Sequence, residues 1–92
     1  MGPMPRVSQF YGITIRMFFN EDFHPGRPHF HVEYAGAKAS FEIVGLDRLA
    51  GVVPARAERL VKRWARLHEA ELLANWERAR KHQSLEPVDP LR

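Results

Sequence analysis

The sequence predicts an α+β domain in which a three- to four-stranded antiparallel β-meander is covered on its apolar face by one long C-terminal α-helix. Apolar and polar residues alternate through the first half of the chain, as expected for half-buried strands. The second half is rich in Ala, Leu, Glu, Arg and Lys and holds no glycine or proline between Pro54 and Pro87. Short connections between the alternating segments favour antiparallel pairing of consecutive strands.

Four segments of the first half are candidate strands. The first spans residues 11–20, where Ile and Met alternate with polar residues. Residues 20–28 hold two prolines and a glycine and are expected to form a loop. A second strand is predicted over residues 29–34, and a third, after a glycine turn, over residues 38–43. Residues 46–53 are expected to add a short fourth strand or a turn.

The helix is expected to begin at Pro54 and to cover residues 55–82, because proline suits the first helical position. Its apolar stripe, which should face the sheet, consists of Leu60, Val61, Trp64, Leu67 and Leu72. A basic ridge on the opposite side consists of Arg59, Lys62, Arg63, Arg66, Arg80 and Lys81. Leu73 and Trp76 lie off the stripe, so we expect them to meet the N-terminal segment, the C-terminal tail or another subunit.

With 92 residues the chain is long enough for one domain and not for two. We assign residues 4–84 to that domain, residues 85–92 to an extended tail that contains prolines, and residues 1–3 to a cloning remnant before a second methionine. No stretch approaches the roughly 20 apolar residues of a membrane span, and no secretion signal is recognisable. Because cysteine is absent, disulfides and thiolate zinc sites are excluded, and we expect a cytoplasmic protein.

The charge balance is mildly basic, with 14 Lys and Arg against 11 Asp and Glu and a net charge of +3. This excess is compatible with binding to nucleic acid but is not evidence for it, because such binding depends on where the charges lie on the surface. The basic ridge could follow a nucleic-acid backbone or an acidic partner, or it could be an ordinary solvated helix face. Glycine-rich phosphate loops, nucleophile elbows and His-Glu-x-x-His motifs are absent from the sequence.

The segment His-Pro-Gly-Arg-Pro-His-Phe-His at residues 24–31 is the strongest candidate for a site. His29 and His31 lie two apart on a predicted strand, so their side chains should leave the same face about 7 Å apart. Arg16 is expected on that polar face, and His24 could fold over it from the loop. The candidate binding residues are Arg16, His24, His29, His31, Glu33 and Glu42.

Three interpretations of this face remain open. His31 and His29 could transfer protons in a metal-free hydrolysis of a phosphodiester while Arg16 stabilises the charge, which makes these three the candidate catalytic residues. The same two imidazoles could instead hold zinc or another divalent metal, and apart from this alternative no cofactor is expected. The face could also be a solvated surface whose cross-strand pairs serve stability alone. Whether the chain is an enzyme is left open.

A second polar cluster, His68, Glu71 and Asn75, follows one face of the predicted helix within its apolar stripe. Buried polar groups need partners, so the cluster is either a polar site between helix and sheet or a structural network. In the structural case, Glu71 would take an arginine and Asn75 would satisfy the backbone of a loop or sheet edge. Because the helix should cover the apolar face, we expect this cluster to be separate from His29 and His31.

Three segments make the chain resemble a small bacterial family, domain of unknown function family 4160, over residues 4–91. They are Met-Pro-Arg-Val-Ser-Gln-Phe-Tyr-Gly-Ile-Thr-Ile-Arg at residues 4–16, the Pro-His-Phe-His stretch that leads into a Glu-Tyr pair, and a helix with Trp-Ala-Arg-Leu-His and Leu-Leu-Ala-Asn-Trp. The motif positions of that family are occupied by Arg16, His29, His31, His68, Asn75 and Trp76. The loop at residues 23–27 is longer than the family's usual connection, so the resemblance does not extend to His24.

Genes of that family tend to sit beside another small uncharacterised protein, in an arrangement similar to toxin–antitoxin pairs. The resemblance therefore implies a component of a toxin–antitoxin-like module. Such a component would bind a protein encoded by the adjacent gene, with RNA as a further ligand, through the sheet face around Arg16, His29 and His31. The alternatives are a small His-based ribonuclease or metal-dependent hydrolase, and a non-catalytic module that forms a homodimer through a sheet edge or through Trp76 and Leu73.

Overall fold

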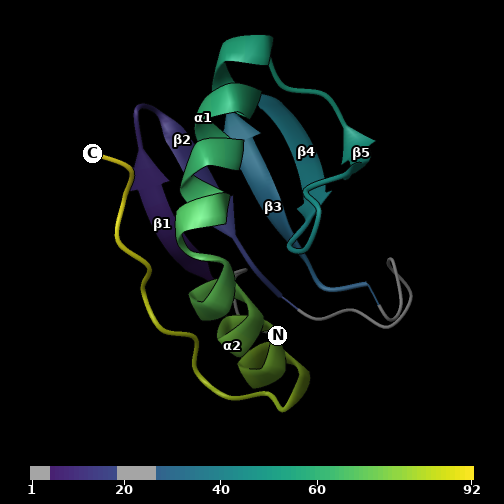
Figure 1. The fold of residues 1–92 in the computed structure, drawn as a ribbon, viewed down its shortest axis with the longest axis vertical. Coiled ribbons are helices and arrows are strands. Elements are labelled where there is room, and N and C mark those ends of the chain that lie inside the picture. Colours follow the sequence, from purple (N-terminus) through teal and green to yellow (C-terminus); the bar gives the residue numbers. More distant parts are fainter. Residues whose placement is uncertain (1–4, 19–26) are drawn as a thin grey trace.

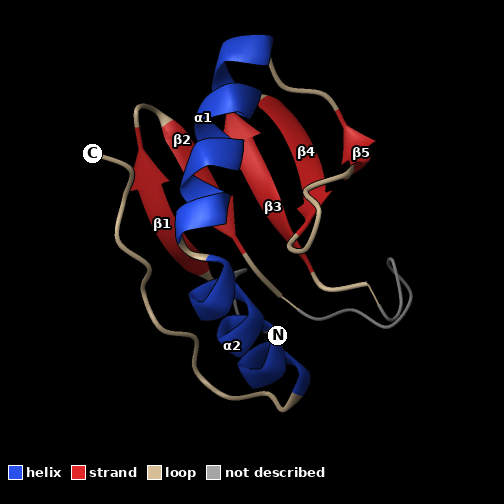
Figure 2. Cartoon of the chain, in the orientation of Figure 1, coloured by secondary structure: helices blue, strands red, loops and turns tan. Residues whose placement is uncertain are grey.

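The computed structural model describes residues 5–18 and 27–92. Within these ranges, five strands form one antiparallel sheet in the order β1-β2-β3-β4-β5, and two helices lie against it (Figures 1 and 2). The strands are β1 (Arg6–Phe10), β2 (Ile13–Arg16), β3 (His29–Tyr34), β4 (Ala37–Glu42) and β5 (Arg48–Gly51). The helices are α1 (Ala55–Leu67) and α2 (Glu69–Arg80). The α+β class and the antiparallel meander are confirmed, whereas the numbers of strands and helices differ from the prediction.

The first hairpin corrects the predicted strand over residues 11–20. A strand that the alternation did not reveal, β1, comes first, and a two-residue turn of Tyr11 and Gly12 joins it to β2. Both turn residues have positive φ, 50° and 78°, as a type I′ hairpin turn requires. Residues 19 and 20 of the predicted strand lie outside the described residues, as does most of the predicted loop over residues 20–28.

The later strands follow the prediction more closely. Strand β3 covers residues 29–34 as expected, and the turn of Ala35 and Gly36 again has positive φ, 48° and 86°. The third predicted strand begins and ends one residue earlier than expected, since β4 covers Ala37–Glu42. Residues 46–53 contain a strand, β5, which is the fifth of the sheet.

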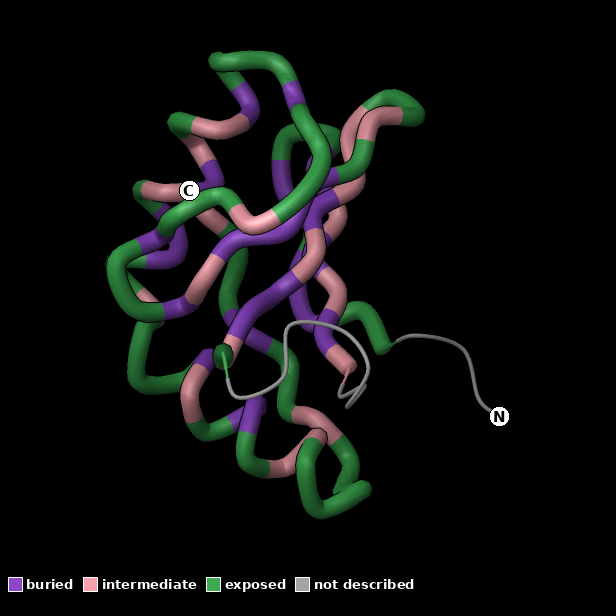
Figure 3. The backbone as a smooth tube through the Cα atoms, turned by 90° about the vertical axis from the view of Figure 1, so that its right-hand side faces the viewer, coloured by how far each residue is buried: buried purple, intermediate pink, exposed green. Residues whose placement is uncertain are grey.

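The core lies between the sheet and α1. Trp64 of α1 is fully buried, and its ring lies 5.3 Å from that of Phe10 and 6.0 Å from that of Phe30, measured between centroids. Buried positions alternate with intermediate or exposed ones along β1 to β4, and the helices likewise alternate between buried and exposed residues (Figure 3). The sheet residues that are fully buried are Ile13, Ile15, Phe30, Val32 and Phe41. Each such side chain contributes roughly 1.5–3 kcal/mol through burial.

The prediction of one long helix over residues 55–82 is wrong. The helix is interrupted at His68, which has φ −121° and ψ 24°, and α2 begins at Glu69. Glu69 and Glu71 stand in the first turn of α2, where carboxylates are favoured by the positive end of the helix dipole. Leu67, the last residue of α1, is 68% exposed although the predicted stripe placed it against the sheet. The break divides the basic ridge between the two helices.

The C-terminal tail packs against the domain. It runs beside β1 in Figure 1, and the backbone N–H of Val88 donates to the carbonyl oxygen of Val7 at 2.8 Å. Val88 is 4% exposed, and Trp64 Nε1 donates to the Asp89 carbonyl oxygen at 2.7 Å. The tail therefore covers the outer edge of β1. Neither α1 nor α2 has the length and apolar character that crossing a membrane requires.

Candidate functional site

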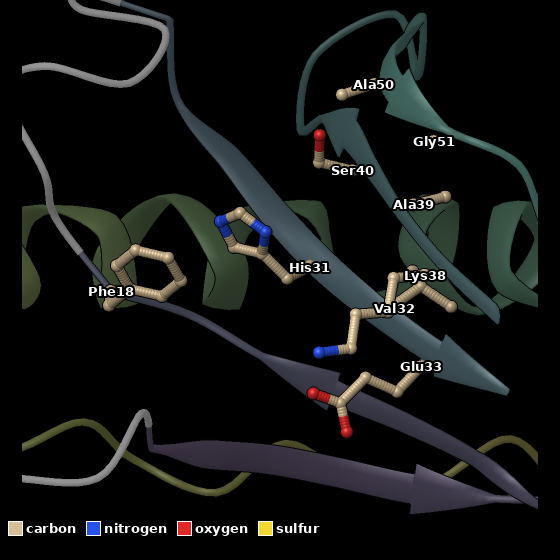
Figure 4. Close-up of a pocket in the computed structure, with 9 residues that line it drawn as sticks. All are labelled: Phe18, His31, Val32, Glu33, Lys38, Ala39, Ser40, Ala50 and Gly51. Carbon is tan, nitrogen blue, oxygen red and sulfur yellow. The ribbon is translucent and has the colours of Figure 1, made fainter. Parts of the chain in front are cut away.

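The sheet face away from the helices, which we call the open face, carries polar side chains in register. One row of successive partners crosses all five strands and consists of Arg6, Arg16, His31, Ser40 and Ala50. The neighbouring row consists of Gln9, Thr14, Glu33 and Lys38. Directly paired residues of antiparallel strands project to the same side. The register thus places Arg16 beside His31, and Figure 4 shows the open face with the helices behind the sheet.

Two contacts hold the middle of the open face. Arg16 Nε donates to Glu33 Oε2 at 3.2 Å, and both side chains are about 30% exposed (29% and 31%). The Phe18 ring stacks on the His31 imidazole with centroids 4.4 Å apart and planes 15° apart. The His31 ring is therefore held in one orientation on this face by its packing against Phe18.

A pocket of about 290 Å³ opens beside this stack, over β3, β4 and β5. Side chains that line it include Phe18, His31, Glu33, Lys38, Ser40 and Ala50 (Figure 4). Phe18 and His31 stand at one end, Glu33 and Lys38 at the other, and Ser40 and Ala50 along the side. Ser40 is 2% exposed, and its Oγ has no hydrogen-bond partner among the described residues.

Strand β5 closes the pocket because Gly51 lies directly against the backbone of β4. A Cβ at Gly51 would collide with the carbonyl oxygen of Lys38, and the residue has φ 70°. The adjacent Val52 N–H donates to that same carbonyl oxygen at 3.1 Å. A glycine is thus required at this position by both space and backbone conformation, and it brings Ala50 to the pocket.

His29, which was predicted to be accessible on the open face beside His31, is buried. It is 1% exposed at the start of β3, and its Nδ1 lies 2.7 Å from the carbonyl oxygen of Arg27. Since a carbonyl only accepts, Nδ1 carries the hydrogen. The His29 ring lies 5.0 Å from that of His31 and 5.0 Å from that of Trp76. Helix α2 reaches this end of the sheet through Trp76, which contributes to the burial of His29.

The remaining binding candidates are divided. Glu42 forms an ion pair with Arg27, and its hydrogen bond and charge raise the pKa of that guanidinium. His24 lies outside the described residues. Among the residues that the structure describes, no three His, Cys, Asp or Glu side chains are grouped so that they could hold a metal ion. From the described ranges, the metal alternative has only His29 and His31 as ligands.

The polar helix cluster separates into two parts. His68 Nδ1 and Glu71 Oε1 lie 2.6 Å apart at the start of α2, so Glu71 pairs with a histidine and not with an arginine. Asn75 is fully buried and binds the backbone of Glu86, which confirms that it satisfies backbone groups. The partner is the tail, however, and not a loop or sheet edge.

Of the residues that line the pocket, the sequence prediction named only His31 and Glu33, and the residues that it missed include Phe18, Lys38, Ser40 and Ala50. Lys38 and Ser40 were recognisable as the polar side of their strand. Their position beside His31 follows from the two-residue turn at Ala35 and Gly36, which fixes the register of β3 with β4. Ala50 could not be found in this way because the pairing of β4 with β5 is irregular next to Ser40.

Comparison with known proteins gives one match. A family described as "Domain of unknown function (DUF4160)" matches residues 12–77, which include β2 to β5, α1 and most of α2. Every residue named here as lining the pocket lies in that range. No curated protein and no solved structure matches the chain.

Proposed function

The chain belongs to the family described as "Domain of unknown function (DUF4160)", and on this premise we propose that it is a component of a toxin–antitoxin-like module. In this proposal it binds the protein encoded by the adjacent gene through the open face around Arg16 and His31. One observation carries the proposal: a row of polar side chains crosses four strands, β1 to β4, on the face opposite the helices and borders a formed pocket.

The charge of the open face indicates the chemistry of the partner. In its two rows of paired residues, Arg6, Arg16 and Lys38 are cationic and Glu33 is anionic, so these rows carry an excess of two positive charges. Such an excess raises the rate at which an acidic surface associates and selects against basic surfaces. We therefore expect the partner to present carboxylates to this face.

The positions of the histidines favour binding over catalysis. Proton transfer by two imidazoles requires both rings to reach the substrate. His29 is 1% exposed and packs against Trp76, so only His31 of the pair lines the pocket. A binding surface needs only the fixed geometry that the Arg16–Glu33 pair and the Phe18–His31 stack supply.

The test is coexpression of the tagged chain with the adjacent gene's product, followed by copurification and a growth assay of the chain expressed alone. Lys38→Glu reverses a charge on the open face, and Arg63→Glu makes the same reversal on the exposed side of α1. We expect the wild type and Arg63→Glu to copurify with the partner and Lys38→Glu to lose at least about tenfold in affinity. Circular dichroism of both variants checks folding.

Two results would count against the proposal. If the two proteins do not copurify and expression of the chain alone leaves growth unchanged, there is no such module. If both charge reversals weaken the complex equally, the partner binds elsewhere than on the open face.

A further inference from the structure

The pocket on the open face contains a hydroxyl group that the fold itself does not use. Ser40 Oγ is buried beside His31 and lacks a hydrogen-bond partner among the described residues, although buried polar groups are usually paired. Alanine would fill the same strand position without leaving an unpaired donor and acceptor. A buried, unpaired hydroxyl that lines a pocket indicates a ligand that completes its hydrogen bonding.

The shape of the pocket suits a flat ring. The nearly parallel rings of Phe18 and His31 form one end, while Ala50 and Gly51 keep the β5 side free of bulky side chains. The volume of about 290 Å³ lies at the lower limit of small-molecule pockets, roughly 300–1,000 Å³, so it suits one ring system and not a large ligand. Aromatic walls of this kind bind nucleic-acid bases by stacking.

The charged groups at the other end complement a nucleotide. Lys38 supplies a cation for a phosphate. The Glu33 carboxylate can only accept hydrogen bonds, so it favours a base that carries an exocyclic amine. The Ser40 hydroxyl both donates and accepts, so it could not by itself select such a base. The net charge of the open face also favours an anionic ligand over a neutral one.

We propose that this pocket binds the base of a ribonucleotide, with Ser40 Oγ bonded to the edge of the base and the phosphate beside Lys38. The nucleotide comes either from a free mononucleotide or from an unpaired position in RNA. The inference shares one premise with the proposed function, namely that the open face is a binding surface. It names a ligand of that face that requires no partner protein.

The first test compares two buried serines. Ser8, like Ser40, is buried with an unpartnered Oγ among the described residues, but it is paired with Ile15 of the core and does not line the pocket. Ser40→Ala and Ser8→Ala are titrated by calorimetry with the four ribonucleoside 5′-monophosphates and with short homopolymer RNAs. We expect saturable binding to the wild type, unchanged binding to Ser8→Ala, and about fivefold to tenfold weaker binding to Ser40→Ala.

A second pair of variants tests the space in the pocket. Ala50→Leu places a larger side chain at the pocket, and Val52→Leu places the same side chain at a position that is 64% exposed and outside it. Ala50→Leu should abolish binding, and Val52→Leu should leave it unchanged. If mononucleotides bind as tightly as RNA, the ligand is a free nucleotide. If RNA binds more tightly and with a stronger dependence on salt, the ligand is RNA.

The outcomes separate this inference from the proposed function. The inference is overturned if neither the mononucleotides nor the RNAs bind, or if Ser40→Ala binds them as the wild type does. It is also overturned if Ala50→Leu blocks copurification of the partner protein while no nucleotide binds, because the pocket then holds a side chain of the partner. If nucleotides bind as expected and no partner copurifies, the inference stands and the proposed function falls.

Discussion

Asn75 and Glu86 exchange two hydrogen bonds, one in each direction. Asn75 Nδ2 donates to the carbonyl oxygen of Glu86 at 2.8 Å, and Asn75 Oδ1 accepts from the Glu86 N–H at 2.9 Å. Arg78 donates a third bond to the same Oδ1 at 2.8 Å. The Asn75 side-chain amide donates and accepts as a paired strand residue would, and it holds the start of the tail against α2. From there the tail continues along β1, where Val88 bonds to Val7.

Asn75→Ala should lower the free energy of unfolding by about 2–3 kcal/mol, because it removes three hydrogen bonds of a buried group and leaves a small void. Asn75→Asp should cost a similar amount, since the carboxylate cannot donate to the Glu86 carbonyl oxygen. Urea denaturation measures both variants, with the exposed Gln83→Ala as the control. Equal stability of Asn75→Ala and Gln83→Ala would show that the tail is not held at this position.

Removal of residues 85–92 should both destabilise the domain and change its association. The truncation exposes the outer edge of β1, takes away the carbonyl oxygen that accepts from Trp64, and removes the buried Val88. We expect a loss of at least about 3 kcal/mol in denaturation and self-association in light scattering, because unprotected strand edges pair with other chains. A truncated chain that stays monomeric and as stable as the full chain would contradict this role of the tail.

The sequence patterns predicted the strands in which apolar and polar residues alternate. They did not predict the turns and the helix break that depend on tertiary contacts. The alternation of β2 continues into Tyr11, so the pattern did not show that Tyr11 and Gly12 form a turn with positive φ. Likewise, the absence of glycine and proline did not predict the helix break at His68. The two glutamates that follow it, which are favourable at a helix start, were the available signal.

The same break explains why the candidate site was predicted only in part. Strand periodicity places His29 and His31 on one face, and the register of β2 with β3 brings Arg16 beside His31. The contact of buried His29 with Trp76 depends on where α2 begins. Local periodicity contains no information about that contact, and therefore it assigned both histidines the same role.

Alanine substitutions should distinguish the two histidines. His29→Ala removes a fully packed ring and its bond to the Arg27 carbonyl oxygen, so we expect a loss of about 2–3 kcal/mol in stability. His31→Ala removes a half-buried ring that stacks on Phe18, which should cost only about 1 kcal/mol. In the nucleotide titration, His31→Ala should bind more weakly than the wild type. The reverse order of stabilities would show that the two rings have been assigned the wrong roles.

Gly51→Ala should lower the free energy of unfolding much more than Gly45→Ala, although both glycines have positive φ. Gly51 and Gly45 have φ of 70° and 85°, so alanine strains the backbone at both positions by about 1–2 kcal/mol. Only at Gly51 does the new methyl group also collide with the Lys38 carbonyl oxygen, whereas Gly45 faces open space. Thermal unfolding of the two variants isolates the cost of the collision. Equal melting temperatures would mean that β5 can move away from β4 without loss.

Ser40→Ala should raise the stability of the free protein by up to about 1 kcal/mol, even though the nucleotide titration predicts weaker binding. Alanine removes a buried hydroxyl that has no partner among the described residues, and with it the cost of taking that group out of water. Ser8→Ala should stabilise by a similar amount without any effect on binding, because Ser8 faces the core. Denaturation of both variants without ligand measures the effect. A Ser40→Ala variant less stable than the wild type would mean that the hydroxyl serves the fold, and stability and binding would then no longer oppose each other at this position.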